Sequence, residues 1–216
     1  MQPVHLPLSS GESVVIGLVT AVFVMVPLLG VPAAHFSGMA REGAHALLAV
    51  ILGVTVAEIL LDRHSGGKTS IAGEGLRVVL VFLIGYLGPS LFGLGAAKLI
   101  SLGDPVTVLW AVVLLLVLVL FLLGRSFGLL SVPFAIAALY VVLRYAHGRT
   151  DVIAAYAVAW LLLLSGVRAV IAHGIRSGAT DNLRGRTHLP RGLWWLLWLA
   201  GTVAALLVGG KLLVFG

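Results

Sequence analysis

Long apolar segments separated by short polar ones run along almost the whole chain. Most of these segments have the length that an α-helix needs to cross a membrane, which is roughly 20 residues at 1.5 Å per residue. The pattern predicts an all-α polytopic membrane protein, a single membrane domain with about seven transmembrane helices. The predicted helices cover residues 13–30, 31–53, 76–100, 105–123, 127–145, 152–173 and 192–215.

Two stretches depart from this pattern. Residues 54–72 combine a β-branched segment with a polar turn that contains paired glycines, which predicts a short membrane-associated β-hairpin with strands at 54–61 and 68–72. The alternative is a second helix that begins near Arg41 and continues to Leu61. Residues 174–191 form a polar segment before the last helix, which opens with several tryptophans, as is typical of a membrane interface.

The amino-terminal residues contain no Lys or Arg, whereas a secretory signal needs a basic region there. We therefore expect the first apolar segment to be a retained anchor that begins after Ser9-Ser10-Gly11-Glu12. The alternative is a cleaved signal, because the GVPAAH stretch at 30–35 imitates a cleavage site.

Composition supports a membrane protein, since 60% of the residues are hydrophobic and only 10% are charged. A net charge of +6 would suggest nucleic acid in a soluble protein, but here the cations lie in short loops and set topology, so we expect no nucleic-acid partner. Seven spans put eight Lys and Arg residues on the amino-terminal side, which predicts that this side is cytoplasmic. They are Arg63, Lys68, Arg77, Arg125, Arg176, Arg184, Arg186 and Arg191, against Arg41, Lys98, Arg144, Arg149 and Lys211 on the other side.

Candidate chemistry is concentrated in the second predicted helix, where Arg41, Glu42 and His45 interrupt an apolar stretch. Ionisable groups at membrane depth are costly and indicate a functional site. The spacing matches the H-E-x-x-H motif of zinc peptidases with its first His replaced by Arg. In that motif the two histidines lie about 6 Å apart along the helix and bind one zinc ion, while the Glu is the general base. The chain has no cysteine, which excludes Cys-ligated zinc and thiol nucleophiles.

The order of motifs resembles the membrane-embedded zinc metallopeptidases of the site-2 protease type, especially their short bacterial branch without a PDZ domain. The segments that carry this resemblance are EGAHALLAVILG, the predicted hairpin, GYLGPSLFG, RSFGLLSV, LLLLSGVRAVI and the polar segment with Asp181 before LPRGLWWLLW. The resemblance implies that Glu42 is the catalytic base, that His45 and Asp181 are metal ligands, and that the cofactor is zinc. It also implies a site near the cytoplasmic side of a bacterial inner membrane.

Arg41 departs from this pattern, because a guanidinium has no lone pair for a metal and stays protonated. Only His45 and Asp181 remain, against three protein ligands in a usual catalytic zinc site. His173 and His188 flank the Asp181 segment and could supply a substitute ligand. The alternative is that Arg41 replaces the metal and forms a structural ion pair with Asp181. Glu42 is a poorer partner by this reasoning, because it projects about 100° away around the helix.

Three functions are compatible with these features. The first is a zinc-dependent intramembrane metallopeptidase that uses Glu42, His45, Asp181 and a substitute ligand. The second, which we favour, is a catalytically impaired relative without a cofactor that binds or regulates transmembrane partners. The third is a small transporter or haem protein, and it is disfavoured because we find no internal repeat. The expected partners are membrane lipids and single-span membrane proteins.

Overall fold

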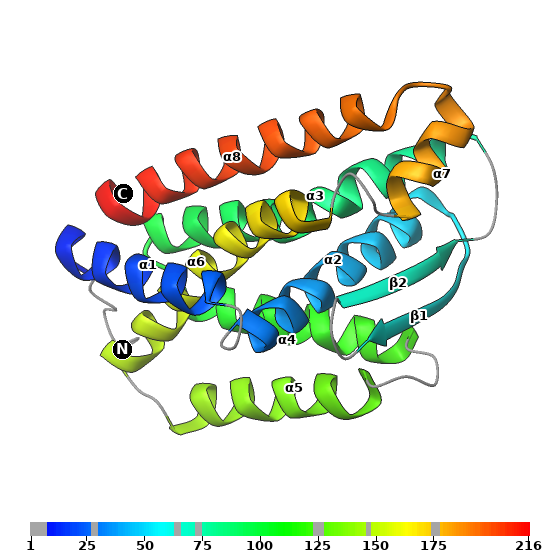
Figure 1. Cartoon of the computed structure of the whole chain (residues 1–216). Helices are drawn as coiled ribbons and strands as arrows, with labels where there is room; N and C mark the ends of the chain where they lie inside the picture. The colour runs from blue at the N-terminus through cyan, green and yellow to red at the C-terminus, as the bar shows by residue number, and fades with distance from the viewer. Residues whose placement is uncertain are drawn as a thin grey trace.

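The computed structural model describes residues 8–26, 30–62, 66–71, 75–122, 128–145, 148–173 and 178–216. Helices dominate this part of the chain, and one pair of strands follows the second helix (Figure 1). In chain order the elements are α1 (Ser10–Met25), α2 (Gly30–Leu52), β1 (Val56–Asp62), β2 (Gly66–Ile71), α3 (Leu76–Ser101), α4 (Pro105–Leu122), α5 (Gly128–Tyr145), α6 (Arg149–His173), α7 (Gly178–Thr187) and α8 (Arg191–Phe215).

Four of the described helices are long and apolar enough to cross a membrane: α3, α4, α6 and α8. Helix α1 and residues 130–145 of α5 are apolar but shorter, and α2 carries the ionisable residues of the motif. The structure thus supports a multi-pass helical membrane protein, and the count of seven spans stays a prediction. Large apolar side chains on the outer surface, such as Phe121, Phe134 and Leu207, fit a lipid environment.

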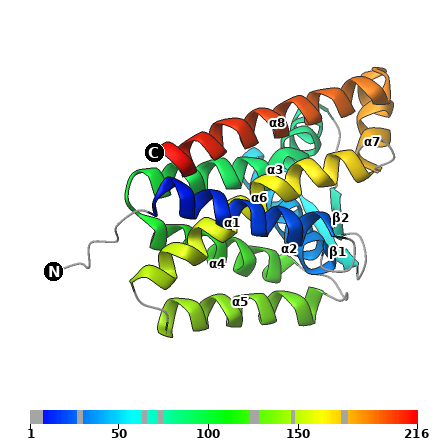
Figure 2. The same ribbon diagram turned by 60° about the vertical axis from the view of Figure 1, so that its left-hand side comes forward.

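A capping box begins α1 at Ser10, three residues before the predicted start of the first helix at residue 13. The amide of Glu12 donates to the hydroxyl of Ser9, and the amide of Ser9 donates to the carboxylate of Glu12. Glu12 also forms an ion pair with Arg149 at the start of α6. Figure 2 shows α1 lying along α6, so this pair joins the ends of two neighbouring helices.

Strands β1 and β2 pair antiparallel, from Val56 opposite Ile71 to Asp62 opposite Gly66, with an irregularity near the open end. They lie beside α2. Positive φ at Gly53 ends α2, a backbone conformation that glycine adopts without strain. The β-branched residues after Gly53 thus leave the helix, so α2 does not continue to Leu61.

The polar segment predicted at 174–191 contains a helix that the sequence pattern did not suggest. Helix α7 is polar, yet it buries Leu183 completely in a cluster with residues of α3, α6 and α8, so tertiary packing stabilises it. Residues 63–65, 174–177 and the link Gly124-Arg125-Ser126, on which parts of the hairpin, polar-segment and loop predictions fall, lie outside the described residues.

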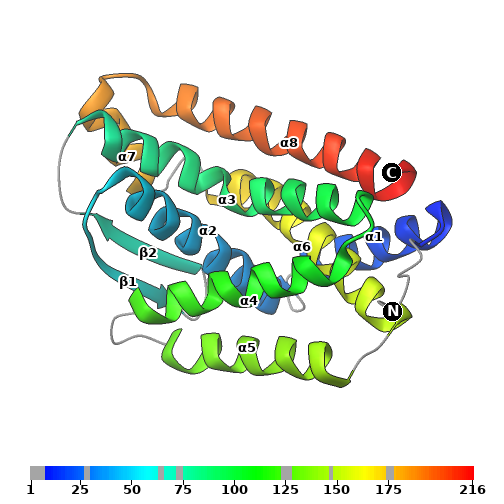
Figure 3. The same ribbon diagram turned by 180° about the vertical axis from the view of Figure 1, so that it is seen from behind.

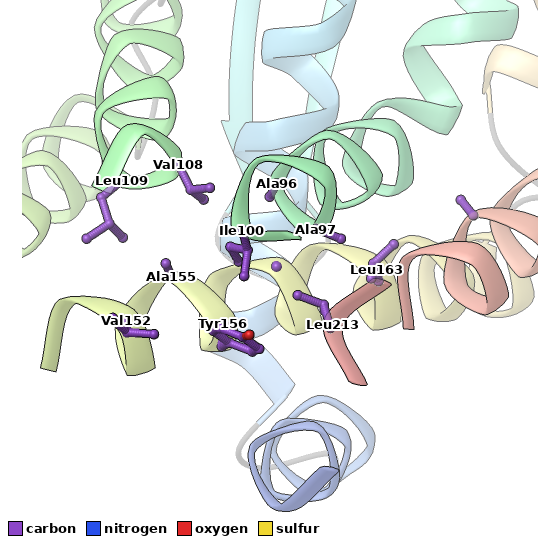
Figure 4. Packing of buried hydrophobic residues seen from close by; sticks show 12 residues of the cluster. Ala96, Ala97, Ile100, Val108, Leu109, Val152, Ala155, Tyr156, Leu163 and Leu213 are labelled. Carbon is purple, nitrogen blue, oxygen red and sulfur yellow. The ribbon is translucent and has the colours of Figure 1, made fainter. Parts of the chain in front are cut away.

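Three groups of buried apolar side chains hold the helices together. The largest joins α3, α4, α6 and α8 and contains Ala97, Leu109, Tyr156 and Leu213 (Figure 4). The second surrounds Trp198 where α3, α6, α7 and α8 meet, and the third joins α2, α4 and α5. Helix α2 therefore lies between α3 on one side and α4 on the other, as Figure 3 shows from behind.

Candidate functional site

The three ionisable residues of the motif lie in the middle of α2, and each is largely or fully buried. Glu42 is 1% exposed and His45 is 4% exposed. One residue of helix advances 1.5 Å and turns 100°, so Glu42 and His45, three residues apart, lie on the same side of α2. This side faces α3, where Phe82, Gly85 and Tyr86 lie.

Arg41 forms an ion pair with its sequence neighbour. Its Nε donates to Oε1 of Glu42 at 2.9 Å, and only 12% of the Arg41 side chain is exposed against 2% of the Glu42 side chain. The sequence predicted that Glu42 would be a poor partner for Arg41, because neighbouring residues project about 100° apart around a helix. The long side chain of Arg41 has enough rotatable bonds to reach around the helix, which the angle between two Cβ directions does not capture.

Arg41 also contacts an aromatic stack that joins three helices. Its guanidinium carbon lies 5.3 Å from the centre of the Tyr86 ring. Tyr86 in turn stacks on Trp198 of α8, with ring centres 4.2 Å apart and planes 16° from parallel. The indole of Trp198 donates to the backbone carbonyl of Leu83 at 2.9 Å. A cation over this stack connects α2 to α3 and α8.

His45 packs tightly against α3. Its ring meets Phe82 edge to face with centres 5.9 Å apart, and a Cβ added at Gly85 would overlap the imidazole. Nδ1 lies 3.4 Å from Oε2 of Glu42. Among the described residues, neither ring nitrogen of His45 has a hydrogen-bond partner, and the same holds for the buried hydroxyl of Tyr86. His45 and Tyr86 thus place buried polar atoms beside the Arg41–Glu42 pair.

Asp181 lies apart from this cluster, in the first turn of α7. Its side chain is 53% exposed and forms an ion pair with Arg191 at the start of α8. The predicted pair of Arg41 and Asp181 is therefore not formed in this structure. Each partner has a nearer opposite charge, Glu42 for Arg41 and Arg191 for Asp181, and the Asp181 carboxylate keeps access to solvent.

The donor set of the described residues does not fit a catalytic zinc ion. No group of three His, Cys, Asp or Glu residues that could hold a metal occurs among the described residues. His45 offers ring nitrogens, but its neighbour on the helix face is the guanidinium of Arg41, whose charge opposes a dication. Of the two predicted substitute ligands, His188 is exposed at the end of α7, and the side chain of His173 lies outside the described residues.

Comparison with known families agrees with this architecture. The sequence profile of the Peptidase M50B-like family matches residues 14–209. The chain belongs to the Peptidase M50B-like family. This confirms the resemblance to site-2 proteases at the level of the family, and the match runs from α1 to α8. Searches of curated proteins and of solved structures found no match.

Sequence analysis missed the aromatic part of the site. Tyr86 lies in the GYLGPSLFG segment that carried the family resemblance, and Trp198 was interpreted only as an interfacial tryptophan. A signal was present, because Phe82, Gly85 and Tyr86 are spaced three or four residues apart and so share one face of α3. Which helix this face meets depends on the tertiary fold. Glu42 and His45, to which the family resemblance assigned the metal chemistry, thus lie beside a cation of the protein itself.

Proposed function

We propose that this Peptidase M50B-like protein is catalytically impaired and binds or regulates transmembrane partners. The observation that supports this most directly is the buried ion pair between Arg41 and Glu42. A general base needs a lone pair directed at the water that it activates. Here one carboxylate oxygen of Glu42 accepts from Arg41, and the other lies next to His45.

The positive charge that a peptidase of this type takes from zinc is supplied here by Arg41. A guanidinium can neutralise Glu42 and hold it between helices, but it cannot bind a water molecule as a Lewis acid does. The cluster thus has the electrostatic balance of a filled metal site without its reactivity. We infer that the fold serves a function other than peptide-bond hydrolysis.

Partner binding is the function that such a fold keeps when hydrolysis is lost. Peptidases of this kind must accept transmembrane segments of other proteins, and a relative without hydrolysis retains the helices that would contact them. The proposal places the protein in a bacterial inner membrane with α2's ionisable cluster toward the cytoplasmic side. The excess of cations in the amino-terminal set of loops supports this orientation.

The competing function is a zinc-dependent intramembrane metallopeptidase with Glu42, His45, Asp181 and a substitute ligand. It has the family membership in its favour. It would require Asp181 to leave Arg191 and approach α2, together with displacement of the Arg41 guanidinium from Glu42. Both changes break ion pairs that the described structure contains.

Zinc content and cleavage separate the two functions. The purified protein is reconstituted into lipid vesicles in the presence of zinc. Bound zinc is then measured, and cleavage of a set of single-span peptides is followed by mass spectrometry. We expect less than 0.1 equivalents of zinc, as an order of magnitude for a site short of ligands, and no cleavage. Peptide binding is followed by energy transfer in the same vesicles, and we expect binding without cleavage.

Arg41→His is the informative variant, because it completes the H-E-x-x-H pattern. Zinc uptake by Arg41→His and none by the parent would show that Arg41 alone prevents metal binding. Glu42→Gln serves as the matched control for cleavage, because it removes the base and preserves size. About one zinc per parent chain, with cleavage that depends on Glu42, would contradict the proposal.

A further inference from the structure

A cavity of about 510 Å³ lies on the side of α2 that faces away from the ionisable cluster. Helices α2, α3 and α4 form its walls, and Leu162 of α6 closes its inner end. Every lining residue is Phe, Leu, Val, Ala or Gly, so the walls offer no polar side chain to a ligand. The part of a ligand that occupies this space must therefore be hydrocarbon.

The cavity exists because α3 and α4 diverge while small residues occupy the facing positions. The two helices share the turn at 102–104 and separate away from it (Figure 3). Gly95 of α3 lines the cavity, and a Cβ added there would meet no other atom within 4 Å. Ala111 lines the opposite wall on α4. Larger side chains at these positions would fill the space from within.

The cavity opens sideways to the membrane. Three of its lining residues, Leu47, Leu91 and Leu114, are 36%, 43% and 68% exposed and form its outer edge. Its deepest part is lined by Leu116 and Ala96, which are 2% and 6% exposed. Lipid chains next to α3 and α4 thus have direct access to it.

The apolar lining argues for an acyl chain rather than a peptide segment. A non-helical peptide would bring backbone amides into an apolar space without hydrogen-bond partners. An acyl chain is narrow and has no such groups.

A cation lies at the end of the cavity nearest the turn between α3 and α4. Lys98 is exposed in the last turn of α3, on the same stripe as the lining residues Leu91 and Gly95, because positions 91, 95 and 98 are spaced by four and three. Among the described residues Lys98 forms no ion pair, and the nearby Asp104 instead caps the first turn of α4 through Thr107. Lys98 is thus available to a phosphate group.

We propose that this cavity is a binding site for one acyl chain of a phospholipid whose phosphate contacts Lys98. The chain lies between α3 and α4 and contacts Phe36, Ala40 and Leu47 of α2. It thereby completes the packing of α2 on the side opposite the Arg41–Glu42 pair. This site is independent of the proposed loss of hydrolysis, because none of its residues belongs to the ionisable cluster.

The test uses the full-length protein in phosphatidylcholine vesicles that contain a trace of phosphatidylglycerol with a photoactivatable diazirine in the middle of one acyl chain. After illumination, the labelled residues are identified by mass spectrometry. We expect labelling concentrated on 91–99 of α3 and 108–118 of α4, and lower labelling of the exposed face of α8 around Leu207. Unlabelled phosphatidylglycerol should compete for the cavity label.

Two variants test the contact with the acyl chain and the contact with the phosphate separately. Gly95→Trp fills the cavity and should reduce cavity labelling by about tenfold or more, whereas Ala204→Trp on the exposed face of α8 should not. Lys98→Gln should reduce labelling by the phosphatidylglycerol probe by about fivefold, which corresponds to one lysine near a phosphate layer. A diacylglycerol probe with the same diazirine chain but no phosphate should be unaffected by Lys98→Gln. Lys211→Gln on α8 is the matched control.

Three outcomes would overturn the proposal. One is labelling spread evenly over all exposed apolar residues, as for lipids that only surround the protein. Another is unchanged labelling in both Gly95→Trp and Lys98→Gln, with thermal unfolding showing that both variants are folded. The third is cross-linking of cavity residues to another polypeptide, which would make a protein segment the occupant. Zinc content and peptide cleavage are measured separately, so failure here leaves the proposed function to its own test.

Discussion

Helix α2 has two sides that differ in chemistry and in packing. Toward α3 it presents Arg41, Glu42 and His45, and glycines of α3 allow the two helices to approach closely. Toward α4 it presents Phe36, Ala40 and Leu47 beside an open apolar cavity. The buried polar groups thus lie where α2 packs tightly against α3. The cavity lies on the other side of α2, where all the lining side chains are apolar.

This comparison shows why the Arg41–Glu42 pair can exist between apolar helices. A buried ion pair is stable only when both partners are held together and water or lipid cannot separate them. Gly88 allows Ala44 to approach, and Gly85 allows His45 to approach, so α3 seals the cluster. A cavity on this side would leave the same charges in hydrocarbon.

Removal of the cation is expected to have the largest effect. Arg41→Ala leaves the buried carboxylate of Glu42 without its ion-pair partner, and the free energy of unfolding should fall by about 3–5 kcal/mol. Thermal unfolding in detergent measures the change. The double variant Arg41→Ala with Glu42→Gln removes the uncompensated charge as well and should recover most of the loss. Equal losses in both would show that the charge pair is not the cause.

A larger side chain in the close contact between α2 and α3 is expected to have the second-largest effect. Gly88→Leu places a side chain where the Cβ of Ala44 lies, and should destabilise the protein by about 2–3 kcal/mol. Gly95→Leu is the matched control on the same helix, because it points into open space. There the change should stay below about 1 kcal/mol in either direction. Equal destabilisation by the two variants would contradict the contrast between the sides of α2.

The aromatic stack should contribute less than the ion pair. Tyr86→Leu removes both the contact with Arg41 and the stacking on Trp198, and we expect a loss of about 1–2 kcal/mol. Tyr86→Phe keeps the ring and removes a hydroxyl that has no hydrogen-bond partner among the described residues. This control should have nearly the stability of the parent in the same unfolding assay. A larger loss for Tyr86→Phe would indicate a partner for the hydroxyl.

Asp181 should matter least for stability. Its pair with Arg191 is about half exposed on both sides, so Asp181→Asn should cost less than about 1 kcal/mol, and high salt should abolish the difference. Arg191→Gln should give a loss of similar size, and the double variant no further loss. A loss comparable to that of Arg41→Ala would instead support a role for Asp181 at the buried cluster.

The positions of the helices were accessible from the sequence because they depend on local patterns. The capping box at Ser9 and Glu12 begins α1, and Gly53 ends α2 where the apolar pattern changes to a β-branched one. Helix α7 was not accessible in this way, since its polar sequence gains stability only when Leu183 is buried by other helices. The sequence predicted Asp181 rather than Glu42 as the partner of Arg41, and the choice between the two depends on where α7 lies.

The sequence alone determined that this is a helical membrane protein and that position 41 cannot bind zinc. Both follow from properties that a residue carries with it: hydrophobicity over the length of a span, and a guanidinium without a lone pair. Only the tertiary structure decided that Arg41 forms an ion pair with Glu42 and contacts the ring of Tyr86, and that Asp181 forms an ion pair with Arg191. It also decided that an apolar cavity lies behind α2. These features depend on distances between segments far apart in the chain, which local patterns do not specify.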